Sequence, residues 1–298
     1  MVTVRLHQID SFTDRQFGGN PTAVVEEGRL LNDAQMKQIA REMNLSESTF
    51  ILPSNEADFR LRFFTPPGDE ITFCGHATVG ALKVICREQL MGCRYGEQNT
   101  LSLQTNAGLL QVDVEAVNKD QCRLSFDVPK IDMVTAPYDL NDVLQALGVP
   151  KAIVNCDTPL MLERTNNYVF FQVNTLKELG SFELDVRGAI DFAQKDRIIV
   201  FCALTMESFD DNNHVHSRGF APLVGVPEDP FTGSMQGGIV GYLVDNDLID
   251  NSMNMIGSEQ GHFIDRPGQV YVEINRFPSL SARLHADAVH VFTTELSL

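Results

Sequence analysis

The sequence states one pattern twice, about 156 to 158 residues apart. An Arg-x-Phe-x-Pro segment occupies residues 62–66 and occurs again at residues 218–222. After a short loop, each copy reaches a glycine-polar step, Cys-Gly-His at residues 74–76 and Thr-Gly-Ser at residues 232–234. A match at so long a period is typical of a duplicated structural unit. We therefore expect two similar halves with a cleft between them, which is where small ligands commonly bind.

Composition narrows the class of protein. The chain has 298 residues and a formal charge of −17, which argues against nucleic-acid binding because phosphates are neutralised by basic patches. We find no apolar run of the roughly 18 residues that a membrane span needs and no secretion signal at the N-terminus, so we expect no membrane association. Six scattered cysteines without a CxxC pair argue against a disulfide framework or zinc-thiolate site and suit the cytoplasm.

Hydrophobic periodicity predicts the same order of elements in both halves. A strand is followed by an amphipathic helix, with Asn32 as N-cap in the first half and Asp185 in the second, and then by two more strands. The segments after the glycine-polar steps, residues 76–91 and 234–244, are apolar on more than one face, as in a buried helix. Strands precede and follow each of them. We therefore predict an α+β fold in which each half wraps a curved sheet or barrel around a central helix.

The expected halves are residues 1–127 with a C-terminal strand at about 286–298, and residues 128–285. Each glycine-polar step would open its central helix, where free backbone N–H groups and the helix dipole attract an anion. Two such ends could hold the carboxylate of a small anionic substrate. The alternative is that glycine and serine merely turn the chain and cap the helix.

Four side chains could carry chemistry. Glu47 lies between the amphipathic helix and the next strand, where partial burial would raise its pKa and suit it to remove a C–H proton; an exposed helix-end carboxylate is the plainer interpretation. A helix N-terminus would lower the pKa of His76 and of Cys74. His76 could instead be only a helix cap, and Cys74 only a small buried apolar residue. Asp229 is a loop acid near Ser234, or simply a turn residue before proline.

Other site types lack support. His214 and His216 have the spacing of a metal pair on a strand, but no Cys, Asp or Glu at a matching spacing accompanies them, so we expect no metal. We find no phosphate-binding lysine loop, no dinucleotide glycine motif and no serine-hydrolase elbow.

An ordered series of short segments resembles the phenazine-biosynthesis PhzF-like proteins, within the diaminopimelate epimerase fold. The matching segments span almost the whole chain and are residues 10–13, 17–21, 46–50, 62–66, 74–78, 228–234, 259–261 and 266–268. The resemblance implies an isomerase with two pseudo-symmetric halves, no metal, no organic cofactor, and often a homodimer.

The resemblance also assigns roles to residues. In the phenazine enzyme a glutamate moves a proton between ring carbons of trans-2,3-dihydro-3-hydroxyanthranilate, and that glutamate corresponds to Glu47. The family's histidine, aspartate and serine correspond to His76, Asp229 and Ser234. We also expect substrate contacts from Asn20, Cys74, Gly75, Thr232 and Gly233.

One departure concerns the related epimerases that use two thiols. Cys74 keeps the first thiol, whereas Thr232 occupies the place of the second. We therefore expect a cofactor-independent isomerase that moves a proton of a small anionic amino acid-like or dihydro-aromatic acid, with Glu47 as single acid and base. A two-base epimerase using Cys74 and Asp229 stays open. So does a catalytically silent member that binds a metabolite or a protein partner.

Overall fold

A computed structural model describes residues 2–298 and divides the chain into two compact units. Unit 1 runs to Asp127 and includes Leu284–Leu298, and unit 2 is Val128–Arg283. The second boundary lies two residues before the position at 285/286 that the sequence suggested, because the strand Ser281–Ala286 runs across it.

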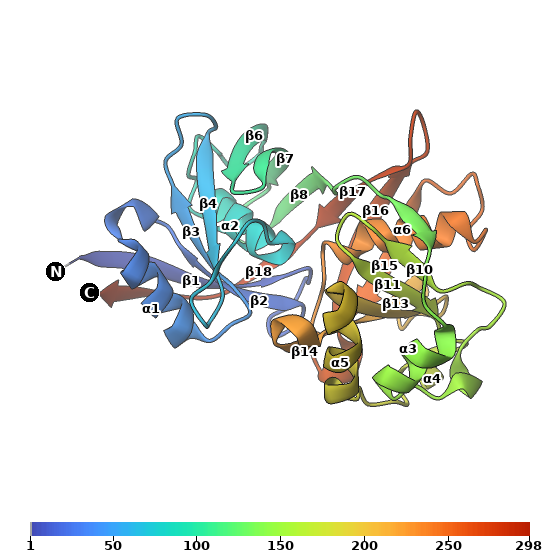
Figure 1. Ribbon diagram of the computed structural model, residues 1–298. Helices are drawn as coiled ribbons and strands as arrows, with labels where there is room; N and C mark the ends of the chain where they lie inside the picture. The colour runs from blue at the N-terminus through green and yellow to red at the C-terminus, as the bar shows by residue number, and fades with distance from the viewer. Residues whose placement is uncertain (1) are drawn as a thin grey trace. The chain divides into compact units, whose positions relative to one another are not determined.

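Unit 1 contains two α-helices in a framework of strands (Figure 1). Its elements are β1 (Thr3–Ser11), β2 (Asn20–Val25), η1 (Gly28–Leu30), α1 (Asp33–Met43), β3 (Ser48–Leu52), β4 (Phe59–Phe64), β5 (Glu70–Ile71), α2 (Gly75–Arg87), β6 (Glu97–Thr105), β7 (Gly108–Ala116), β8 (Cys122–Asp127) and β18 (Ala288–Ser297). β18 lies antiparallel along β1, so the two ends of the chain share one edge of this unit.

Unit 2 contains the remaining elements. They are β9 (Met133–Thr135), α3 (Leu140–Leu147), η2 (Lys151–Ile153), β10 (Met161–Glu163), β11 (Tyr168–Gln172), α4 (Leu176–Leu179), α5 (Val186–Asp196), β12 (Val200–Thr205), β13 (Val215–Ala221), η3 (Pro222–Val224), β14 (Val226–Asp229), α6 (Met235–Asp245), β15 (Met255–Gln260), η4 (His262–Ile264), β16 (Gly268–Asn275) and the first part of β17 (Ser281–Ala286).

The two units repeat one order of strand pairing. In unit 1, β1 and β2 pair antiparallel, β2 and β3 parallel, β3 and β4 antiparallel, β4 and β6 parallel, and β6 and β7 antiparallel. In unit 2 the same directions join β10, β11, β12, β13, β15 and β16 in turn. The predicted α+β fold with two pseudo-symmetric halves is therefore confirmed.

The predicted amphipathic helices form where their caps indicated. Asn32 makes a capping box with Gln35 at the start of α1, and Asn44 ends that helix in a left-handed conformation. Asp185 caps α5 by accepting a hydrogen bond from the backbone of Gly188. Asn44 thereby turns the chain sharply toward β3, and Glu47 lies in this turn.

The two central helices are buried and lie against the strands of their own units. In α2 every residue from Gly75 to Cys86 is buried, and the helix contacts β1, β2, β3, β7, β8 and β18 (Figure 1). Gly80 allows the close approach, since a Cβ there would lie 2.2 Å from Thr22 Cγ2 on β2. Gly238, at the equivalent position of α6, would place a Cβ 2.2 Å from Phe170 Cζ on β11. The duplication thus extends to the packing of helix on strand.

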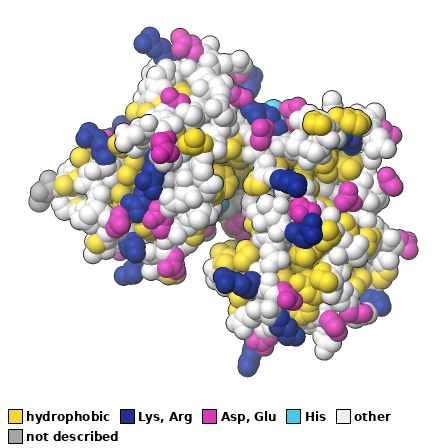
Figure 2. Space-filling model, turned by 45° about the horizontal axis from the view of Figure 1, so that its top comes forward, with side chains coloured by type: hydrophobic (Ala, Val, Ile, Leu, Met, Phe, Trp, Pro, Cys, Tyr) yellow, Lys and Arg dark blue, Asp and Glu magenta, His cyan; other side chains and the backbone are white. Residues whose placement is uncertain are grey.

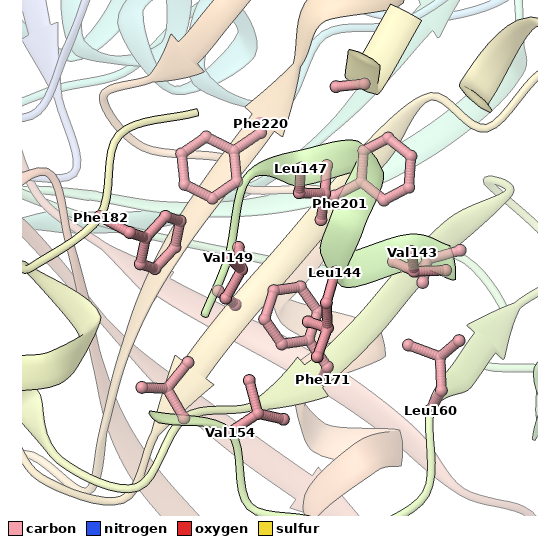
Figure 3. Close-up of a cluster of buried hydrophobic side chains, with 14 of the residues drawn as sticks. Val143, Leu144, Leu147, Val149, Val154, Leu160, Phe171, Phe182, Phe201 and Phe220 are labelled. Carbon is pink, nitrogen blue, oxygen red and sulfur yellow. The ribbon is translucent and has the colours of Figure 1, made fainter. Parts of the chain in front are cut away.

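A separate apolar core lies in unit 2 between α3, α5 and the sheet (Figure 3). Phe171 and Phe201 project from neighbouring parallel strands toward Leu144 and Leu147 of α3. α3 has no counterpart among the described residues of unit 1, so the internal repeat does not predict it. Near the C-terminus, β17 and β18 are separate strands divided at Asp287.

Charged side chains of both signs are interspersed on the face shown in Figure 2, as the mixed composition leads one to expect. None of the helices in the described part of the chain has both the length and the apolar character that crossing a bilayer requires.

Candidate active site

The arginine of each Arg-x-Phe-x-Pro segment fixes the hairpin that leads to the central helix. In unit 1, Arg62 of β4 binds Glu70 of β5 through two hydrogen bonds of 2.6 and 2.8 Å. In unit 2, Arg218 of β13 binds Glu228 of β14 in the same way, at 2.7 and 2.9 Å. Each guanidinium also lies over the phenylalanine two residues later, at 5.0 and 4.9 Å from the ring centre. Bidentate pairing of this kind is geometrically specific, so the hairpin before each glycine-polar step is held in the same geometry.

The first candidate group gathers at the start of α2. Nε2 of His76 lies 3.1 Å from Oε2 of Glu47, and Nδ1 of the same ring lies 3.4 Å from Sγ of Cys74. The hydroxyl of Ser46 lies 3.2 Å from Nε2. His76 therefore bridges a carboxylate and a thiol, an arrangement able to move protons among three groups. We call Glu47, Cys74 and His76 the unit-1 group.

A residue of β1 holds the backbone at His76 in place. Ser11 Oγ donates a 2.7 Å hydrogen bond to the carbonyl of His76, and Cys74 precedes the helix in an extended conformation without a side-chain cap. Asn20, another predicted contact, is fully buried at the start of β2, where it pairs with Ser11. Gly75 is the first residue of α2. The helix N-terminus thus begins at Gly75 and His76, as the sequence predicted.

The protonation states differ from the sequence expectation. Burial would raise the pKa of Glu47, but hydrogen bonds and charge from His76, with smaller contributions from Ser46 and Cys74, hold that pKa below its ordinary value. The predicted rise in the pKa of Glu47 is therefore wrong. The reason is that the turn before β3 brings its carboxylate to the imidazole, which a linear reading of the sequence does not show.

The two expectations for the helix N-terminus are also wrong. Burial, with a further contribution from the Glu47 charge, raises the pKa of Cys74 to about 11. Burial would lower the pKa of His76, but Cys74 and Glu47 together raise it well above its ordinary value. Because the thiol is neutral at pH 7, the carboxylate is the charge that acts on the imidazole there. The group at neutral pH is a carboxylate–imidazolium pair beside a thiol.

The second candidate group lies in the loop between β14 and α6. Thr232 Oγ1 donates a 2.5 Å hydrogen bond to Asp229 Oδ2. Gln260, a buried residue at the end of β15, holds both residues in place. Its amide nitrogen donates a hydrogen bond to the backbone carbonyl of Asp229 at 2.8 Å and another to Thr232 Oγ1 at 3.2 Å. Its amide oxygen accepts a hydrogen bond from the backbone N–H of Thr232 at 3.1 Å. Gly233 follows, and its carbonyl accepts from Gln236 N in the first turn. We call Asp229, Thr232 and Ser234 the unit-2 group.

Ser234 has a partner that the sequence argument missed. It is the N-cap of α6, but its side chain makes no cap, and its hydroxyl lies 2.9 Å from the hydroxyl of Tyr168 at the start of β11. Tyr168 stands 66 residues earlier and carries no motif, so only strand pairing brings it to the helix. A tyrosine hydroxyl that donates to Ser234 leaves the serine hydrogen free to donate elsewhere.

Comparison with known proteins places the chain in a family. The model of the PhzC-PhzF family, described as phenazine biosynthesis-like protein, matches residues 9–294. An uncharacterized isomerase of Clostridium acetobutylicum is 33% identical, with 98% of each chain covered. The trans-2,3-dihydro-3-hydroxyanthranilate isomerase of Pseudomonas aeruginosa is 30% identical, over 88% of this chain and 87% of that protein.

Solved structures agree on the fold. The crystal structure of a PhzF-family phenazine biosynthesis protein from Bacillus anthracis superposes with a TM-score of 0.88 at 24% identity, covering 100% of both chains. The predicted resemblance is confirmed by these matches. The chain therefore belongs to the PhzC-PhzF family of phenazine biosynthesis-like proteins, has a diaminopimelate epimerase-like fold, and is an isomerase.

Proposed function

We propose that this isomerase moves a proton between two carbons of a small anionic substrate and that Glu47 alone removes and returns that proton. The contact between Glu47 Oε2 and His76 Nε2 carries the proposal. It supports a carboxylate that is ionised at neutral pH although its side chain is only 16% exposed. A largely dry carboxylate with one oriented cation is a suitable acceptor for a C–H proton.

The chemical step balances without a co-reactant. Glu47 takes a proton from a carbon next to the electron-withdrawing group of the substrate, and the bonding pair moves into a conjugated anion. The neutral carboxylic acid then gives a proton to another carbon of that anion, or back to the first carbon, and its acid proton can exchange with water before it does so. The N-terminus of α2 at Gly75 and His76 would stabilise the developing negative charge, since its backbone N–H groups and dipole favour anions.

Protonated His76 has two roles in this account. It keeps Glu47 ionised before the reaction, and its hydrogen bond orients one carboxylate oxygen so that the other can face the substrate. Cys74 approaches the far nitrogen of the ring and, because its pKa is raised to about 11, acts as a hydrogen-bonding partner rather than as a thiolate base.

We propose that the same reaction depends on the unit-2 group and that the substrate is an amino acid-like or dihydro-aromatic acid. Ser234 would donate a hydrogen bond to the substrate, and Asp229, held by Thr232 and Gln260, would bind a polar substituent. The name of the Pseudomonas aeruginosa relative supports a cyclic, unsaturated amino acid as the first compound to test.

The test is proton NMR in heavy water. Trans-2,3-dihydro-3-hydroxyanthranilate and a panel of anionic amino acids would be incubated with the wild-type protein and with Glu47→Gln, and isomerisation and deuterium uptake followed together. We expect at least one compound to be isomerised by the wild type and Glu47→Gln to lose about 10²- to 10⁴-fold in rate. Circular dichroism would confirm that the variant is folded.

Three results would speak against the proposal. Wild-type rates in Glu47→Gln would remove Glu47 from the chemistry. Inversion at a single carbon with loss of activity in Cys74→Ser would favour a two-base epimerase using Cys74 and Asp229. Thermal stabilisation by a ligand without any exchange of its protons would favour a binding protein.

A further inference from the structure

Unit 2 contains three side chains with metal-binding atoms that belong to neither candidate group. They are His216, Glu259 and His262, whose ligand atoms all lie within 4.8 Å of one another. The sequence suggested His214 and His216 as a pair, but His214 Nδ1 accepts a hydrogen bond from the backbone of Gly257. The partners of His216 come from more than forty residues further along the chain, so their spacing carries no sequence signal.

Strand pairing explains why these side chains meet. His216 on β13 is directly paired with Thr205 on β12 and with Glu259 on β15. Directly paired residues place their side chains on one face of a sheet, so these three form a row across it. His262 follows in η4, immediately after β15, and its Nδ1 lies 3.1 Å from Nε2 of His216.

The separation of the two imidazoles fits a shared ion. Two nitrogens at about 2.0–2.1 Å from a tetrahedral zinc ion are about 3.3 Å apart. Without a metal, the two facing nitrogens of the neutral rings can form only one hydrogen bond between them. With a metal, both lone pairs are used.

Glu259 is positioned like a metal-binding carboxylate. It is 1% exposed and, among residues 2–298, makes no ion pair with lysine or arginine. Oε1 accepts hydrogen bonds from Asp210 N and Asn213 Nδ2, and Oε2 accepts one from Phe209 N, each at 2.8 Å. Oε2 therefore keeps a lone pair for a metal, and the three donors orient the carboxylate as outer-shell partners do in metal sites.

A second observation concerns the far side of the His216 ring. Nδ1 of His216 and Oγ1 of Thr205 are both buried and, within the described residues, both lack a hydrogen-bond partner. A histidine that binds a metal through Nε2 carries its proton on Nδ1 and donates it to a nearby oxygen. Thr205 stands at the paired position to accept it, so metal binding would give both orphaned atoms a partner after a small adjustment.

The group differs from a similar one in unit 1. His7, Glu26 and Glu88 also lie close together, but Arg5 already binds Glu26 at 3.1 Å and Glu88 at 3.0 Å. A cation therefore already occupies that acidic group. The carboxylate of Glu259 has no such cation.

An ion could reach the unit-2 histidines from the surface. His262 is half-buried, and the ring of Phe209 stacks on it at 4.3 Å with an interplanar angle of 11°. Phe209 is itself 53% exposed and lies in the loop that Glu259 holds. Phe209 thus covers one face of the imidazole.

We propose that His216 Nε2, His262 Nδ1 and Glu259 Oε2 bind one divalent metal ion of the zinc class in unit 2. Two imidazoles with one carboxylate favour Zn²⁺, Co²⁺ or Ni²⁺ over Mg²⁺ and Ca²⁺, which prefer oxygen ligands. The ion would connect η4 to β13 and, through Glu259, to the loop that contains Phe209.

Cobalt and zinc titrations test the site. Full-length protein freed of metal by a chelator would be titrated with Co²⁺ while its visible absorption is followed, and the bound Co²⁺ then displaced with Zn²⁺. We expect one equivalent to bind with the absorption of a tetrahedral or five-coordinate nitrogen–oxygen site and without a thiolate charge-transfer band. That band would report binding at Cys74 instead. We expect His262→Gln to weaken the affinity at least tenfold.

Matched variants keep the test decisive. Glu259→Gln should also weaken binding, whereas substitution by Gln of His290, a half-buried histidine of unit 1, or of His76 should leave it unchanged. Circular dichroism would show that each variant is folded. Failure of the wild type to bind an equivalent, or binding that survives both His262→Gln and Glu259→Gln, would overturn the proposal and leave His216 and His262 as a hydrogen-bonded pair only.

Discussion

The first turns of α2 and α6 are held by the same structural features but carry different polar side chains. Both helices follow a hairpin fixed by a bidentate arginine–glutamate pair. Both also contain a glycine, at the same sequence distance from the glycine-polar step, that lets a strand pack closely against the helix. At the start of α2, however, a buried imidazole meets a carboxylate and a thiol. At the start of α6, a serine meets a tyrosine, and an aspartate meets a threonine.

This difference separates what duplication preserves from what the reaction needs. The residues that both units share determine how the central helix packs on its strands and how the preceding hairpin folds, and each unit needs these features for its own fold. The changed residues set the chemistry: unit 1 has an ion pair between Glu47 and His76, whereas in unit 2 the Asp229 carboxylate accepts a hydrogen bond from the hydroxyl of Thr232. The comparison predicts that base chemistry belongs to unit 1 and that unit 2 supplies hydrogen-bond donors.

His76→Gln should produce the largest effect on this comparison after Glu47 itself. Without the imidazolium, burial is left to raise the pKa of Glu47, so less of the carboxylate is ionised. We expect isomerisation to fall about 10- to 100-fold at pH 7. Rates measured against pH show the cause, since the acidic limb of the profile should move to higher pH.

The rate of the wild-type protein should depend on pH in a way that follows from the same two pKa shifts. The pKa of Glu47 lies below 4.5 and that of His76 well above 6.5, so the ion pair persists across the interval between them. Activity should hold constant through neutral pH, fall as Glu47 is protonated in acid, and fall again as His76 loses its proton in alkali. A bell centred on the ordinary histidine pKa would contradict the ion pair.

Gly80→Ala and Gly238→Ala test the shared frame. Each new Cβ would lie 2.2 Å from a packed side chain, and forced repacking of a core costs about 1–3 kcal/mol. We expect similar losses in the free energy of unfolding for the two variants. Because the chain has no tryptophan, urea denaturation would be followed by far-ultraviolet circular dichroism. Stabilisation by either substitution would contradict the claim that glycine is needed there for the helix to pack closely on the strand.

Tyr168→Phe tests the donor role of unit 2. The change removes one hydroxyl and leaves the ring, so Ser234 loses a partner worth about 1 kcal/mol. We expect roughly a fivefold loss in kcat/KM with an unchanged pH profile. A shift of the pH profile would instead mean that Tyr168 belongs to the acid–base chemistry.

Cys74→Ser should have the smallest effect. A serine keeps a hydrogen-bonding group beside His76 Nδ1, and a thiol with a pKa of about 11 supplies little thiolate near pH 7. Less than about a threefold change in kcat/KM is expected on this account. A loss comparable to that of Glu47→Gln would revive the two-base mechanism.

Much of the frame could be predicted from the sequence because its determinants are local. The cap residues Asn32 and Asp185 and the all-round apolar segments mark helix ends and buried helices through neighbouring residues. The helix α3 was missed because comparison of the halves can reveal only what both contain. The expected cleft between the halves stays a prediction.

The sequence named three side chains that the structure brings into contact, but it did not indicate their protonation states. Glu47, Cys74 and His76 were all named from the sequence, yet each pKa direction was wrong because the shifts come from contacts among the three. Tyr168, Gln260 and the partners of His216 were missed for a related reason. They reach their positions through strand pairing over long separations, where no short motif records the contact.

The central claim is that one carboxylate in unit 1 both removes and returns the proton. Solvent deuterium uptake, measured by NMR on the substrate pool and the product together, would compare Glu47→Gln with the isosteric Asp229→Asn. We predict that Glu47→Gln lowers isomerisation and uptake alike by about 10²- to 10⁴-fold, whereas Asp229→Asn slows isomerisation but retains uptake at the substrate carbon. Uptake that persists in Glu47→Gln, or that disappears only in Asp229→Asn, would contradict the account.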